Sequence, residues 1–150
     1  MYQAWLDFHR GTLLWKCAGV TDLQLKSASV PPSGLTLLGL LRHMSEVERA
    51  WFRTRAAGIK LPDLYCTEED EDGDFDNVAD ADVEQARATF RDECLAADEA
   101  VRAMSLDDTF AGRRGPISLR WAYVHMIEEY ARHNGHADLI RECIDGATGD

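Results

Sequence analysis

The chain has 150 residues, a length that suits one domain spanning residues 1–150. Hydrophobic residues make up 45% and charged residues 29%, a composition that is typical of a globular protein and excludes a disordered or fibrous one. Asp and Glu number 27 against 16 Lys and Arg, and the net charge of −11 argues against a nucleic-acid partner, which would require a basic surface.

Neither a membrane span nor a disulfide framework is expected. The longest apolar stretch, residues 35–41, falls far short of the roughly 20 residues that a membrane helix requires. The first residues, MYQAW, do not resemble a secretion signal, so we expect a cytoplasmic protein without membrane contact. The cysteines lie far apart and form no Cys-x-x-Cys pair, which favours reduced thiols at Cys17, Cys66, Cys94 and Cys143.

Apolar residues at three- and four-residue steps predict two long helices in the first part of the chain. The first covers residues 2–18 and ends at Gly19. Two prolines then interrupt the chain, and the second helix covers residues 35–57, with Ser33 as its expected N-cap and Gly58 as its C-terminal signal.

The second half of the chain repeats this pattern after an acidic connection at residues 61–80. Asp70, Asp72 and Asp74 alternate there as in a calcium loop, but the glycine and the final glutamate of such a loop are misplaced, so we interpret the connection as a solvated acidic loop. Helices are expected at residues 82–104 and 117–144, the last begun by Pro116 and ended by Gly146. The predicted fold is an all-α four-helix bundle with one long crossover between the second and third helices.

The last predicted helix carries a cluster of titratable side chains. Relative to Glu129, the side chains of His125, His133 and His136 lie within about 40° on a helical wheel. The same side carries the mostly small or apolar residues Ser118, Ala122, Met126, Ile140, Cys143 and Ile144, so the cluster is expected to face the core. A carboxylate and three imidazoles are expensive to bury alone; they must pair with each other, bind a cation or line a wet cavity.

A divalent metal would resolve this cost most simply. Glu129 and His133 are one helical turn apart, which lets both side chains reach one ion at about 2 Å. A third ligand would come from another helix, where the remaining histidines are His9 and His43. His43 borders an apolar stripe and can point inward, whereas His9 is better explained as a capping or surface residue.

Two segments resemble a known family: residues 41–52, LRHMSEVERAWF, and residues 129–138, EYARHNGHAD. Together with residues 32–40, PSGLTLLGL, they are similar to the DinB-like superfamily, and most of all to its mini-circle-protein branch, related to mycothiol-dependent maleylpyruvate isomerase. The resemblance implies a four-helix bundle, commonly a homodimer, whose divalent metal would be held by His43, Glu129 and His133. It leaves zinc as the first choice of metal, with nickel, iron or manganese as alternatives.

Three protein ligands would leave open positions at the metal, as in a catalytic site. The resemblance implies a low-molecular-weight thiol as the nucleophile and a small electrophile as the substrate, which makes the chain a candidate thiol transferase or isomerase. We expect His136 and His125 to assist catalysis as orienting groups or proton shuttles. The alternative is a non-catalytic dimeric bundle that binds a metal or ligand, with a stress or regulatory role. Trp5, Trp51 and Trp121 are expected in the core or at an interface.

Overall fold

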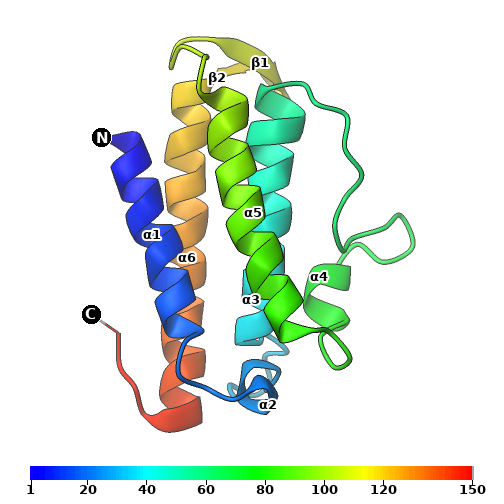
Figure 1. The fold of residues 1–150 in the computed structure, drawn as a ribbon, viewed down its shortest axis with the longest axis vertical. Helices are drawn as coiled ribbons and strands as arrows, with labels where there is room; N and C mark the ends of the chain where they lie inside the picture. Colours follow the sequence, from blue (N-terminus) through cyan, green and yellow to red (C-terminus); the bar gives the residue numbers. More distant parts are fainter. Residues whose placement is uncertain (150) are drawn as a thin grey trace.

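A computed structural model describes residues 1–149, and four long helical segments lie side by side in it (Figure 1). They are α1 (Tyr2–Lys16), α3 (Leu37–Glu48) continued by the π-helix η1 (Arg49–Ala56), α5 (Val83–Val101) and α6 (Leu119–Asp145). Two single-turn helices, α2 (Asp22–Leu25) and α4 (Gly73–Asp76), lie in the connections. The predicted, mainly helical fold is therefore confirmed, and none of the described helices has the length and apolarity to cross a membrane.

The helix ends follow the sequence signals at the C-termini better than at the N-termini. Gly19, Gly58 and Gly146 all adopt positive φ angles just after a helix, as predicted for C-terminal stop signals. The N-cap expected at Ser33 and the helix start expected at Pro116 are both wrong. Thr36, whose hydroxyl accepts a hydrogen bond from the Gly39 amide, caps α3, and Ser118 caps α6.

An antiparallel hairpin, absent from the all-α prediction, covers one end of the helices (Figure 1). Strand β1 (Thr109–Gly112) pairs with β2 (Gly115–Ser118), with Phe110 opposite Ile117. Pro116 lies in β2 and not at the start of a helix. Each strand is four residues long, too short to produce a recognisable alternation of apolar and polar residues, so no strand was predicted here.

The connections between the long helices also differ from the prediction of a single long crossover. Residues 17–36 with α2, residues 57–82 with α4, and residues 102–118 with the hairpin each form a substantial connection. The connection between the second and third long helical segments is thus one of three of substantial length, and it is not distinguished as a single long crossover. Polar turns and single-turn helices lack the long periodicity on which the prediction relied.

The polar face of α3 holds the acidic connection against the bundle. The Arg42 guanidinium donates hydrogen bonds to the carbonyl oxygens of Gly73 (3.0 Å) and Asn77, and the Glu46 carboxylate accepts from the amides of Leu64 and Tyr65 at 2.8–2.9 Å. The expectation of a solvated loop is therefore wrong for part of this segment. Charged groups of α3 fix the backbone of this segment. The short helix α4 packs against α3, and Figure 1 shows its place in this connection.

Candidate metal centre

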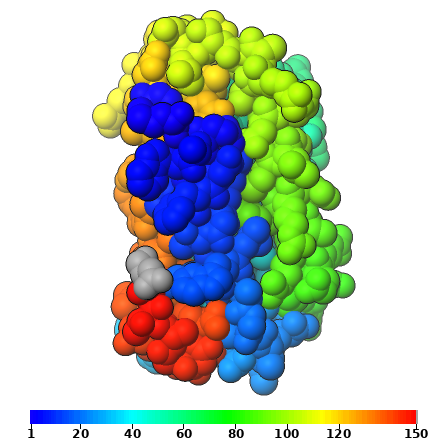
Figure 2. Space-filling model, turned by 60° about the vertical axis from the view of Figure 1, so that its left-hand side comes forward, coloured from blue at the N-terminus to red at the C-terminus, as the bar shows by residue number. Residues whose placement is uncertain are grey.

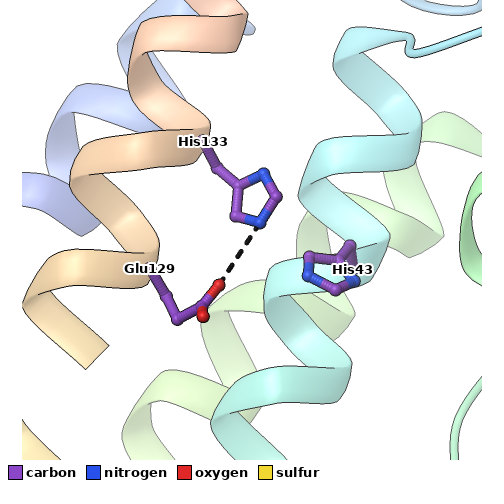
Figure 3. A group of neighbouring side chains, drawn as sticks. All are labelled: His43, Glu129 and His133. Carbon is purple, nitrogen blue, oxygen red and sulfur yellow. Dashed lines mark ion pairs between the residues drawn. The ribbon is translucent and has the colours of Figure 1, made fainter. Parts of the chain in front are cut away.

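The structure brings together the three residues proposed as metal ligands. His43 projects from α3 toward α6, where Glu129 and His133 lie one turn apart (Figure 3). One ligand atom from each of the three side chains lies within 4.8 Å of the others, and the His133 Nε2 is 3.5 Å from a Glu129 carboxylate oxygen. Two nitrogen donors and one oxygen donor thus converge between two helices.

His43 is oriented by a carboxylate outside this group. Its Nδ1 lies 2.7 Å from Oδ2 of Asp74, whose side chain is only 4% exposed. A carboxylate accepts hydrogen bonds, so neutral His43 carries its proton on Nδ1 and presents the lone pair of Nε2. A metal-binding histidine commonly donates its second N–H to a carboxylate in this way, which fixes the ring and its tautomer.

His133 is neutral at ordinary pH, as a ligand must be. Burial, with smaller contributions from the nearby imidazoles of His43 and His136, lowers its pKa to about 4. The side chain is 12% exposed, and its Nδ1 lies 3.4 Å from Nδ1 of His136. His136 therefore contacts the nitrogen of His133 that faces away from Glu129.

His125 lies on the other side of Glu129, among aromatic rings. Its Nε2 is 3.7 Å from a Glu129 oxygen, and its ring centroid lies 4.4 Å from that of Trp51 and 5.0 Å from that of Trp121. Glu128 joins His125 and Glu129 in a second group with ligand atoms within 4.8 Å, but it is exposed. The two accessory histidines thus flank Glu129 and His133 along α6.

The inward face predicted for α6 is correct except at Cys143. Ala122, Met126 and Ile140 are buried and Ile144 packs partly buried against the core, whereas Cys143 is exposed. The tryptophans were predicted in the core or at an interface. Trp5 and Trp121 are 55% and 45% exposed, so for these two the core is excluded and the interface stays a prediction.

Asp74 is the site residue that the sequence analysis missed, because it was assigned to the solvated acidic loop. Its position depends on the preceding glycine: a Cβ on Gly73 would collide with the Tyr65 carbonyl oxygen and crowd the Asp70 carboxylate. A glycine within an acidic run, followed at once by an aspartate and an aromatic residue, was the available signal. Phe75 stacks on the His43 ring at 4.7 Å between centroids.

The residues present fit a divalent transition metal. Two imidazoles and a carboxylate form the mixed nitrogen and oxygen donor set that zinc and its neighbours accept. A buried carboxylate holds one of the imidazoles, and the other is neutral. Without a cation, Glu129 has only long contacts of 3.5–3.7 Å to imidazole nitrogens among the described ion pairs, so its charge is poorly compensated.

The mainly helical fold is compatible with a protein of the DinB-like class. A family model described as mycothiol-S-transferase matches residues 1–146, so the chain belongs to the mycothiol-S-transferase family. The resemblance that the sequence analysis stated is thereby confirmed. Searches among curated proteins and among solved structures found no match.

Proposed function

We propose that this chain is a metal-dependent transferase that joins a low-molecular-weight thiol of the mycothiol type to a small electrophile. The family indicates a mycothiol-dependent transferase-like function. The single observation that carries the metal dependence is the convergence of His43, Glu129 and His133, from two helices, within 4.8 Å. Zinc is the first candidate, and nickel, iron or manganese suit the same donors.

The bound ion would supply one chemical effect, a lowering of the pKa of a thiol that binds it. The chain's own side chains position the other participants. Asp74 holds the Nδ1 proton of His43, and His136 lies against Nδ1 of His133, so each imidazole ligand has a neighbour that fixes its ring. His125, 3.7 Å from Glu129, is placed to hold the proton that the thiol releases.

The reaction conserves atoms and electrons without a further reagent. The sulfur electron pair forms a new bond to the electrophilic carbon, and either a leaving group departs with its bonding pair or the electron pair moves to the neighbouring atom. The proton lost by the thiol passes to His125 or His136 and then to the product or to water. Both histidines are therefore proposed as catalytic assistants.

We also propose that the protein is a homodimer formed through an exposed apolar stripe on α1. The stripe consists of Trp5, Phe8 and Trp15, each more than half exposed, and the rings of Trp5 and Phe8 contact edge to face at 5.9 Å. Figure 2 shows that α1, in blue, occupies the middle of one face between α6 and α5. Aromatic residues concentrated on one exposed helix are typical of a contact surface.

Metal content and turnover test the proposed function together. We expect protein purified without a chelator to hold one equivalent of divalent metal, and His43→Ala and His133→Ala to lose it while keeping their helix content. His9→Ala is the matched control, because His9 is a partly buried histidine outside the group. A full equivalent of metal in either ligand variant would contradict the assignment.

Turnover separates the transferase from the alternative, a non-catalytic metal- or ligand-binding dimer. With mycothiol and 1-chloro-2,4-dinitrobenzene, we expect conjugate formation that requires the metal and falls at least a hundredfold in His133→Ala. Metal bound by wild-type protein without conjugation of this or other small electrophiles would favour the non-catalytic dimer.

A further inference from the structure

A hollow separate from the candidate metal ligands lies where η1, the hairpin and the N-terminal end of α6 meet. Its volume is about 720 Å³, and its lining includes Trp51, Arg55, Arg113, Arg114 and Trp121. The hollow is therefore built from two indole rings and three guanidinium groups. None of these five residues belongs to the candidate metal ligands.

The two tryptophans form an aromatic wall. Their ring centroids lie 5.5 Å apart with an interplanar angle of 46°, and the Arg55 guanidinium lies over the Trp51 ring at 4.3 Å. Trp121 remains 45% exposed, although indole is among the least favourable side chains to leave in water. This wall offers stacking area for a flat ring.

The charge of the hollow is opposite to that of the chain. Within residues 1–149, Arg55, Arg113 and Arg114 form no ion pair, in a chain whose net charge is −11. Most other arginines pair with a carboxylate, as Arg49 and Arg53 do with Glu93. The hairpin places Arg113 and Arg114 side by side in the turn between β1 and β2. Unpaired guanidinium groups bind carboxylates well, because their planar donors match two oxygens at once.

His125 connects the tryptophans of this hollow to the candidate metal centre. The His125 ring stacks on Trp121 with an interplanar angle of 13°, and its Nε2 lies 3.7 Å from Glu129. The tryptophans that line the hollow are therefore in contact with the histidine that borders the candidate ligands.

We propose that this hollow binds the electrophilic substrate, and that this substrate is a flat aromatic or conjugated carboxylate. The ring stacks on Trp51 and Trp121, and Arg55, Arg113 and Arg114 hold the carboxylate. The identification of the ligand as the substrate rests on the proposed function, whereas the binding of an aromatic carboxylate does not.

Titration of the full chain with benzoate, followed by tryptophan fluorescence, tests the proposal without turnover. Benzamide has the ring without the charge, and acetate has the charge without the ring. We expect benzoate to bind at least tenfold more tightly than either, with the same affinity before and after removal of metal by a chelator. The double variant R113Q/R114Q should lose at least tenfold in benzoate affinity and little in benzamide affinity.

The control is the double variant R91Q/R102Q, which removes the same charge from exposed positions on and next to α5, outside the hollow. It should bind benzoate as the wild type does. Equal binding of benzoate and benzamide, unchanged binding in R113Q/R114Q, or binding only to metal-loaded protein would overturn the proposal. If benzoate binds as expected and mycothiol conjugation fails, the proposed function alone is wrong; conjugation without a preference for benzoate contradicts only this inference.

Discussion

At the scale of single residues, the hydrogen bond between His43 and Asp74 sets which nitrogen of His43 faces the candidate metal site. The 2.7 Å contact leaves Nε2 of His43 free for a cation, and Asp74 is almost fully buried beside it. Without Asp74, the His43 ring would keep its contact with Phe75 but lose the carboxylate that sets its tautomer. The proposed metal affinity therefore depends on a residue that is not itself a candidate ligand.

Asp74→Asn is expected to weaken metal binding by about 10- to 100-fold, the usual effect of losing a carboxylate behind a histidine ligand. The amide can still contact His43, but it lacks the charge that makes the imidazole a stronger donor. Affinity is measured by competition with a chromophoric chelator for zinc. Asp76→Asn, an exposed change in the same short helix, is the control and should leave affinity unchanged. Equal affinities in the two variants would exclude the orienting role of Asp74.

At the scale of elements, a buried carboxylate clamps η1 to α5. Glu93 of α5 accepts hydrogen bonds from Arg49 at 2.5 Å and from Arg53 at 2.7 Å. Burial alone would raise the pKa of Glu93, but these two guanidinium groups lower it below its ordinary value of 4.5. The clamp fixes the π-helix that carries Trp51 to the hollow described above.

The clamp predicts a pH dependence of stability. Because the pKa of Glu93 is lowered in the folded protein, the ion pairs contribute fully above pH 4.5, and their contribution is lost as the pH falls further through the folded pKa. Glu93→Gln should therefore lower the free energy of unfolding by about 2 kcal/mol at pH 7. The difference between wild type and variant, measured by urea unfolding, should shrink as the pH falls below 4.5. A constant difference over that range would contradict the role of the charge.

At the scale of the whole molecule, one buried glutamate joins three of the long helices. Glu48, at the end of α3, is fully buried. Its carboxylate accepts hydrogen bonds from Nε and Nη2 of Arg10 on α1, at 2.7 and 2.8 Å. It also accepts one from the Tyr130 hydroxyl on α6, at 2.8 Å. Burial alone would lower the pKa of Arg10, but Glu48 raises it above its ordinary value. Arg10 also contacts Asp98 of α5 at 2.9 Å, so the network reaches all four long helical segments.

Glu48→Gln should lower the free energy of unfolding by about 3 to 5 kcal/mol, because it leaves the buried Arg10 without the charge that compensates it. Chemical denaturation measures the effect. Glu99→Gln removes a carboxylate from an exposed ion pair with Arg102 and should change stability by less than about 0.5 kcal/mol. A similar small change in Glu48→Gln would mean that the network contributes little to the fold.

The proposed homodimer is also tested at this scale. Replacement of both Trp5 and Phe8 by Glu places two charges on the exposed stripe of α1, and sedimentation velocity should then show a monomer at concentrations where the wild type is a dimer. Leu23→Glu on α2, where the side chain is 81% exposed, is the control and should remain dimeric. A wild-type monomer, or a variant that stays dimeric, would contradict the proposed interface.

The sequence by itself determined the long helices and the candidate ligands on α6. Both depend on local periodicity, because residues three and four apart lie on the same face of a helix. Helical spacing alone therefore places Glu129, His133 and His136 on one face of α6. The glycines that end the helices can also be predicted from the local sequence, since glycine adopts a positive φ angle readily in any context. The place of His43 beside an apolar stripe made it the third candidate, and the family resemblance implied the same residue.

Only the tertiary structure decided which residues from distant parts of the chain meet. Asp74 lies 31 residues from His43, inside an acidic run whose composition is typical of solvated loops, and it is buried because α3 holds the loop backbone. The hairpin that brings two arginines to Trp51 and Trp121 is too short to leave a periodic signal. Contacts of this kind depend on the packing of whole elements, and local periodicity carries no information about such packing.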